Sequence, residues 1–220
     1  MNIADAIATR RSVRGFLPQD VPQEDLQAIF QLAQHAPSNC NTQPWVVHVV
    51  SGAALRQLGQ RLCQAALDPA QHTPDFPYDG RYEGVYRERQ QDSAAQLFNA
   101  LGIAREDKAG RARSFLRNFD FFEAPHAAFI FLPEPFGLRE AADCGLYAQT
   151  LMLAMKGQGV ASCPQTSLTF HPTIVREMLG VPAAHKLLLG ISFGYEDPQH
   201  AANLCRVSRA PLEATANFHS

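Results

Sequence analysis

The sequence has no run of about 18 consecutive apolar residues that could cross a membrane. Its first residues, MNIADAIATRRS, lack the apolar core and cleavage site of a secretory signal. Its five cysteines form no CxxC pair and are odd in number, which favours reduced thiols over a disulfide framework. With a formal net charge of −2 and dispersed basic residues, it has no stripe that would track a nucleic-acid backbone. These absences predict a cytoplasmic protein that binds neither membrane nor nucleic acid.

Signatures of several common enzyme classes are missing as well. The sequence has no GxGxxG, no Walker loop, no HExxH and no GxSxG, so dinucleotide-fold, P-loop, zinc-protease and α/β-hydrolase functions lack support. No zinc-binding pattern occurs, and no metal site is predicted. A nucleophilic cysteine would have to be Cys40 or Cys163 paired with a histidine. Neither has a charged neighbour in the sequence that would favour the thiolate.

What the sequence does have is a clear order of apolar patterns. Apolar residues at helical spacing predict helices over residues 3–10, 22–35, 53–67, 85–101, 109–122, 139–158 and 172–179. Short β-rich runs predict strands over residues 45–50, 125–132, 160–163 and 185–193. This order of elements predicts an α+β fold, in which helices cover a small sheet.

Three of these segments carry further expectations. Residues 45–50, WVVHVV, are apolar almost throughout, which predicts a strand buried on both faces. Residues 139–158 form a helix that is apolar on too many sides for the surface, so we expect it at the centre or in a subunit interface. The block from residue 68 to 123 opens with a surface excursion rich in Pro, Asp, Gly and Tyr. We expect this block to be an insertion over the core, because long excursions are often lids or substrate loops.

The ten residues APSNCNTQPW, from Ala36 to Trp45, join a predicted helix to the first predicted strand. Pro37 and Pro44 restrict the backbone at both ends of a dense set of short hydrogen-bonding groups. Such a loop could grip a ligand, or it could be a polar turn after a helix. The stretch alone does not favour either interpretation.

A cluster of cationic and hydroxyl groups follows the first predicted helix. Arg10, Arg11, Ser12 and Arg14 offer the donors that a phosphate group needs, although a solvated basic helix end would look the same. Arg206, Ser208 and Arg209 form a second, distant set. If the tail folded back onto the first helix, these contacts would supply about 6 kcal/mol. Micromolar binding needs about 8 kcal/mol, so the ligand would also need a flat apolar body.

A second proline-bracketed polar turn leaves the third predicted strand at Pro164, Gln165 and Thr166. A backbone N–H here could face the flat body of such a ligand and stabilise the anion of a reduced ring. The amide and hydroxyl groups of the loop at residues 36–45 suit the alternating N–H and C=O edge of a flavin. The geometry of both contacts is a hypothesis.

Taken together, these segments resemble one known family. The sequence is similar to the FMN-dependent nitroreductases in five segments. These are RRSVRGF near the N-terminus, APSNCNTQPW before a strand, a long helix ending in GQGVASCPQ, the segment LLLGISFGYEDP, and a late Arg before Pro-Leu. The resemblance implies interlocked homodimers of α+β subunits, each with a small, mainly antiparallel sheet. It also implies FMN at the subunit interface and a C-terminal tail that reaches the partner, with residues 1–220 as one domain.

The resemblance also implies roles for individual residues. The residues that bind the phosphate and ribityl side of FMN would be Arg10, Arg11, Ser12, Arg14 and Arg209, with Arg206 as an addition. The residues that contact the flavin from the partner subunit would be Pro37, Ser38, Asn39, Asn41 and Gln43. Those near the reactive nitrogen would be Pro164, Gln165 and Thr166. The residues of the insertion that contact the substrate would be Tyr82, Tyr86, Arg87 and Phe98. No side chain is assigned as catalytic, and the backbone near Gln165 and Thr166 would serve the flavin.

Two departures from the family pattern are visible. Cys40 stands where the family often has Ser, Ala or Gly, and the turn after Pro164 carries Gln165, Thr166 and Ser167 in place of Glu-Gly. The implied activity is reduction of nitroaromatic or quinone acceptors by NADH or NADPH in ping-pong order. Flavin reduction or reductive dehalogenation on the same fold, and a flavin-binding protein without turnover, are the alternatives.

Overall fold

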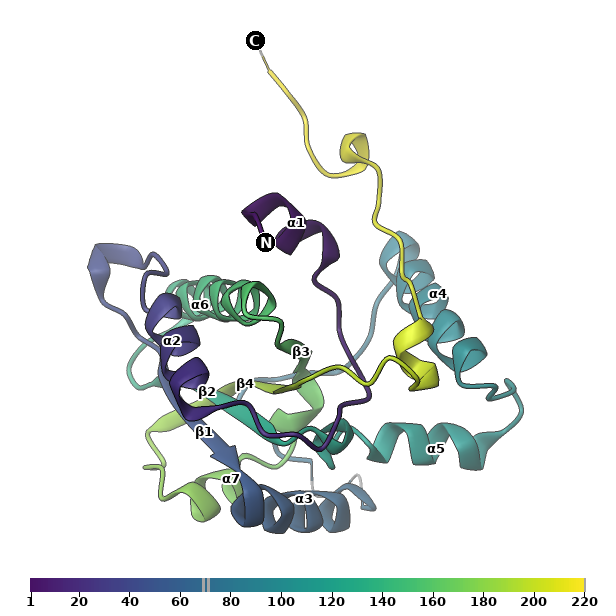
Figure 1. Ribbon diagram of the computed structural model, residues 1–220, viewed down its shortest axis with the longest axis horizontal. Helices are drawn as coiled ribbons and strands as arrows, with labels where there is room; N and C mark the ends of the chain where they lie inside the picture. Colours follow the sequence, from purple (N-terminus) through teal and green to yellow (C-terminus); the bar gives the residue numbers. More distant parts are fainter. Residues whose placement is uncertain (69, 71, 220) are drawn as a thin grey trace.

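A four-stranded sheet lies at the centre of the computed structural model, which describes residues 1–68, 70 and 72–219 (Figure 1). The strands are β1 (Val46–Ser51), β2 (His126–Pro133), β3 (Ala161–Gln165) and β4 (His185–Gly194). They lie in the order β1-β2-β4-β3, and each neighbouring pair is antiparallel. The predicted α+β class and the antiparallel sheet are therefore confirmed.

Helices cover both faces of this sheet. Figure 1 shows α2 (Gln23–Ala33) and α6 (Leu138–Gly157) on one face, and α3 (Gly52–Ala66) and α7 (Pro172–Leu179) on the other. Strand β2 is buried along nearly its whole length, because its alternating side chains enter two different cores. Ala128, Ile130 and Leu132 pack toward α2 and α6, whereas Ala127, Phe129 and Phe131 pack toward α3 and α7.

The remaining helices stand further from the sheet. They are α1 (Ile3–Thr9), α4 (Gly84–Ala100) and α5 (Lys108–Leu116). Helix α4 has no buried residue. Strand β1 is at the sheet edge, and Val49 is 43% exposed. The prediction that this strand is buried on both faces is wrong for the single chain, because only Val50 of its six residues is fully buried and the helices leave the rest half-buried or exposed.

The helix predicted over residues 109–122 ends early, at Leu116. Phe121, Phe122 and Glu123 follow with φ values of 55°, 56° and 62°, a left-handed turn without glycine. Side chains that carry a Cβ adopt this conformation at a cost, so tertiary packing must hold it. Both phenylalanine side chains are buried in the core on the α3 side, which supplies that packing.

The surface excursion predicted after residue 68 is anchored to the core at Asp75. Its Oδ2 accepts hydrogen bonds from Arg176 Nη1 at 2.5 Å and from the Leu187 backbone N–H at 2.7 Å. The Asp75 side chain is 9% exposed and that of Arg176 is 14% exposed. This carboxylate therefore ties the excursion to α7 and β4, a contact that the sequence pattern did not reveal.

His126 is a buried, titratable residue at the start of β2. Its Nε2 accepts a hydrogen bond from the Val21 N–H at 2.9 Å, so in the neutral ring the proton lies on Nδ1, 2.5 Å from Ser51 Oγ. Burial lowers the pKa of His126, and Asp20 opposes this only in part. The unfolded chain, with a histidine pKa of about 6.5, then binds the proton more readily than the folded chain.

We therefore expect the free energy of unfolding to be highest above about pH 6.5 and to fall as the pH drops below that value. Urea unfolding at several pH values would measure the slope. His126→Gln should flatten the slope, while His48 and His200, whose pKa values burial also lowers, still contribute. An equally steep slope in the variant would contradict the assignment to His126.

Candidate functional site

The N-terminal basic segment lies along the free edge of β3. The Val13 N–H donates to Ser162 O at 3.1 Å, and Ser12 pairs with Ser162 in a parallel bridge. Further on, the Leu17 N–H donates to Tyr195 O at 2.9 Å. The sheet edge therefore places Arg10 to Arg14 beside β3, which ends with Pro164 and Gln165.

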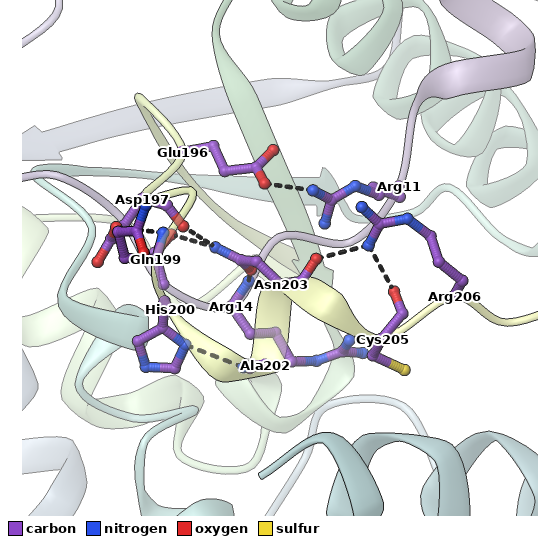
Figure 2. A network of polar contacts seen from close by, with 11 residues as sticks. Arg11, Arg14, Glu196, Asp197, Gln199, His200, Ala202, Asn203, Cys205 and Arg206 are labelled. Atoms are coloured by element: carbon purple, nitrogen blue, oxygen red, sulfur yellow. Dashed lines mark hydrogen bonds and ion pairs between the residues drawn. The ribbon is translucent and has the colours of Figure 1, made fainter.

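Asn203 fastens the C-terminal segment to this basic segment (Figure 2). Its Oδ1 accepts from the Arg14 N–H at 2.8 Å, and its Nδ2 donates to Gly15 O at 2.8 Å and to Asp197 O at 2.9 Å. Asn203 is 2% exposed. A Cβ on Gly15 would overlap the His200 ring, so glycine is needed for this close approach. The tail does fold back onto the start of the chain, as the sequence interpretation required.

The sequence interpretation missed Asn203. It bonds to Gly15 across 188 positions of the chain, and no local pattern could indicate such a contact. Glu196 was missed for the same reason. It forms an ion pair with Arg11, which Figure 2 shows, so the guanidinium of Arg11 is already neutralised by a carboxylate. Among the predicted phosphate ligands, Arg11 is therefore the weakest candidate.

The two basic segments enclose a cavity of about 930 Å³. Its cationic lining residues are Arg10, Arg11, Arg14, Lys156, Arg206 and Arg209. Within the described part of the chain, Glu196 is the only acid in the lining. Ser12 from the basic segment, Gln149 from α6 and Ser93 from α4 add polar groups. The predicted donor sets from both ends of the sequence thus meet in one place, with a strong excess of positive charge.

Two features of this cavity suit it to an anion. Arg10 Nη1 is buried and has no hydrogen-bond partner among the described residues. Burial lowers the pKa of Arg10, and the neighbouring Arg209 guanidinium lowers it further. Like charges repel at this range, and a buried donor without an acceptor costs free energy. A phosphate between Arg10 and Arg209 would relieve both penalties, so the residues present fit a phosphate-bearing cofactor.

The other arginines of the tail bond to backbone carbonyls. Arg206 Nη1 donates to Asn203 O at 2.5 Å and to Cys205 O at 3.0 Å. Arg209 Nη1 donates to the carbonyls of Val207 and Ser208, each at 3.1 Å. These contacts orient the guanidinium groups without removing their charge, which leaves them able to attract an anion.

The turn predicted at Pro164 begins later than expected. Pro164 and Gln165 are the last residues of β3 and pair with β4, and a 3₁₀ turn over Thr166–Thr169 follows. Pro164 is half-buried and Thr166 is exposed. The Gln165 side chain is buried and fully used: its Nε2 donates to Asn118 O at 2.9 Å, and its Oε1 accepts from Ser192 Oγ. Only the backbone of Gln165 could therefore serve a ligand. The preceding Cys163 lies near Arg14 and Arg10, contrary to the sequence interpretation, but burial outweighs them and raises the pKa of its thiol.

The loop after α2 lies apart from the arginine cavity. The Asn39 N–H donates to Asp143 Oδ2 at 3.0 Å near the start of α6, whereas Lys156 lines the cavity near the end of α6. The two positions are separated by about 20 Å of helix at about 1.5 Å per residue. None of the predicted loop residues lines the cavity of the same chain.

Hydrogen bonds within the loop at residues 36–45 make it rigid. The Gln43 N–H donates to Ser38 Oγ at 3.0 Å, and Gln43 Nε2 donates to Asn41 O at 3.0 Å. Cys40, Asn41 and Gln43 have φ values of 50°, 56° and 47°. Left-handed residues other than glycine concentrate at ligand-binding sites, where the surroundings hold them in place. Cys40 thus stands where glycine would be less strained, which is the departure noted in the sequence.

The four predicted substrate residues do not form one group in a single chain. Tyr82 and Tyr86 are 46% and 65% exposed, and Arg87 is exposed beside them on α4. Phe98 lies at the other end of α4, where the guanidinium carbon of Arg111 is 4.3 Å from its ring centroid. Phe98 is therefore separated from the two tyrosines by most of the helix.

The comparisons with known proteins identify the family of this chain. A model of the nitroreductase family matches residues 7–195. The chain belongs to the nitroreductase family. It is 48% identical over 213 residues to the nitroreductase NfnB of Mycolicibacterium smegmatis, which spans 96% of this chain and 90% of that protein. It is 33% identical over 216 residues to a 4-nitrobenzoate reductase of Pseudomonas putida, spanning 96% of this chain and 93% of that one.

Solved structures of this family share the fold. The crystal structure of the FMN-dependent nitroreductase NfnB from Mycobacterium smegmatis, in complex with NADPH, superimposes with a TM-score of 0.94 at 47% identity. The match covers 99% of this chain and 97% of that one. Within residues 1–68, 70 and 72–219, no helix of this nitroreductase is both long and apolar enough to span a bilayer. The same residues contain no cluster of His, Cys, Asp and Glu suited to a metal ion.

Proposed function

We propose that this nitroreductase uses FMN to reduce nitroaromatic or quinone acceptors with NADPH or NADH. The observation that carries the proposal is the buried, unpartnered Arg10 Nη1 next to the Arg209 guanidinium, in a cavity that both ends of the chain enclose. Bound FMN would supply the redox chemistry, taking hydride from the nicotinamide and passing electrons to the acceptor in ping-pong order. The relatives named above support this activity, and a 4-nitrobenzoate reductase among them favours an acidic nitroaromatic.

The residues of the chain have distinct parts in this proposal. Arg10 and Arg209 bind the phosphate, and Ser12 and Arg14 face the ribityl side, because all four meet at one cavity. Arg206 adds to the positive charge, while Arg11 holds Glu196. The backbone at Gln165 and Thr166 borders the ring. No side chain is assigned to proton transfer, since water can supply the protons.

The second wall of the site comes from a partner subunit in this proposal. The length of α6 separates the arginines from five loop residues of the same chain: Pro37, Ser38, Asn39, Asn41 and Gln43. A homodimer would bring the loop of one subunit to the cavity of the other. Ile3 and Ile7 on α1, which are 66% and 57% exposed, and the exposed tail residue Leu212 offer apolar area for such an interface.

The proposal also includes the domain organisation and the location of the protein. Residues 1–220 would form one FMN-binding domain, with residues 68–123 as an insertion that carries Tyr82, Tyr86 and Arg87. The cytoplasmic location is supported by the cysteines, all five of which are free thiols.

Purification tests the function directly. We expect a yellow protein whose flavin absorbance is bleached by NADPH under nitrogen and restored by 4-nitrobenzoate. Restoration by free flavin or a haloaromatic, and not by nitroaromatics or quinones, would favour the flavin reductase or dehalogenase alternative. A flavin that NADPH and NADH leave oxidised would indicate binding without turnover. A colourless protein that does not take up added FMN would rule out all of these.

A further inference from the structure

A second, smaller cavity lies between α4 and α5. Its volume is about 140 Å³, and Arg14 lines both cavities. Its apolar lining residues are Leu97, Phe98, Leu101, Phe115, Phe122 and Ala202. An apolar cavity of about 150 Å³ in another protein is known to take up benzene. This cavity therefore has the size and the lining for one six-membered aromatic ring.

The polar part of the lining is cationic. Arg14, Arg111 and Arg117 line this cavity. The guanidinium carbon of Arg111 lies 4.3 Å from the Phe98 ring centroid, and that of Arg117 lies 5.6 Å from the Phe122 ring centroid. Arg117 is neutralised by Glu123, to which it donates at 2.7 Å and 3.1 Å. Among the described residues, no carboxylate forms an ion pair with Arg14 or Arg111. Two positive charges next to an apolar hollow therefore lack a counter-ion.

Arg111 is well placed to meet a ligand in this cavity. Its guanidinium carbon lies 4.3 Å from the Phe98 ring centroid, and its Nη1 donates to Arg105 O at 3.2 Å. Stacking on Phe98 restricts the side chain, so little conformational entropy remains to be lost when an anion binds.

We propose that this cavity binds a monocyclic aromatic carboxylate of the benzoate type. The ring would lie among Leu97, Phe98 and Phe122, and the carboxylate would face Arg111 and Arg14. A free phosphate matches the charge but leaves the apolar wall exposed, and a neutral ring leaves both cations without a partner. Among the described residues, Arg14 alone lines both this cavity and the phosphate cavity, so the two sites are distinct, and this one does not require FMN.

Fluorine NMR with 4-fluorobenzoate tests the proposal on the FMN-loaded protein. We expect a dissociation constant of about 1 mM or lower for a ligand of this size. Acetate, which lacks the ring, and 4-fluorobenzamide, which lacks the charge, should each bind at least about tenfold more weakly. The flavin absorbance spectrum, recorded in the same samples, reports any ligand that stacks on the flavin instead.

Two variants locate the ligand. Ser114→Phe places a ring in the cavity, which Ser114 lines, and Arg111→Gln removes one cation at nearly constant shape. Each should weaken 4-fluorobenzoate binding at least about tenfold, with FMN content and the circular dichroism spectrum unchanged. If Ser114→Phe does not fold, Arg111→Gln alone decides. Full binding in the folded variants, equal binding of the benzamide, or no binding at about 10 mM would each overturn the proposal.

Discussion

Replacing both Arg10 and Arg209 with alanine should weaken FMN binding by about 10²- to 10⁴-fold. Each guanidinium would lose a charge-assisted contact worth about 1.5 to 3 kcal/mol, so the pair accounts for about 3 to 6 kcal/mol. Every 1.4 kcal/mol or so corresponds to about a factor of ten in affinity. Fluorescence titration of the FMN-free protein with FMN measures the dissociation constant directly.

The effect should depend on where the arginine lies. Arg56→Ala, at an exposed position on α3 on the other side of the sheet, removes the same charge and should leave FMN affinity within about twofold. Arg11→Ala should weaken binding less than Arg10→Ala, because Arg11 already pairs with Glu196. An FMN affinity that is unchanged in the double variant would remove the phosphate site from this cavity.

The free energy of unfolding should fall by about 3 to 5 kcal/mol in Asp75→Ala. The change leaves Arg176, which is 14% exposed, without its carboxylate and leaves the Leu187 N–H without its acceptor. For a chain of this length, we expect the melting temperature to drop by about 6 to 20 °C. Chemical denaturation and thermal melting of the two proteins side by side provide the measurement.

The neighbouring residue on α7 supplies the control. Glu177 pairs with Arg61 at 2.7 Å, but the two side chains are 56% and 44% exposed. Glu177→Ala should therefore cost less than about 1 kcal/mol. If the two variants lose equal stability, the Asp75 pair is not the anchor of the excursion after α3.

Much of the architecture could be predicted from local patterns. The helices over residues 3–10, 53–67, 139–158 and 172–179 and all four strands were predicted to within a few residues, because periodicity and flanking Gly or Pro mark them. The helix predicted over residues 109–122 was too long. The left-handed turn at Phe121–Glu123 contains no glycine that would have indicated it in the sequence. Only the packing of two phenylalanines in the core determines it.

The site was predictable as far as its chemistry is local. The basic residues near positions 10 and 209 predict a phosphate site if the tail folds back, and the structure brings both sets of residues to one cavity. Asn203 causes the tail to fold back, through bonds to residues at the other end of the chain. The same limit applies to Asp75, whose partner Arg176 is 101 positions away. Side chains of this kind become recognisable only when the fold brings their partners together.

The loop at residues 36–45 and the arginine cavity lie at opposite ends of α6. In the proposed dimer, this separation has a genetic consequence. Each site would take its arginines from one chain and its loop from the other. Pairing a chain with defective arginines and a chain with a defective loop would place both defects in one site. The other site would then be assembled entirely from intact parts, so two inactive alleles could complement each other in one cell.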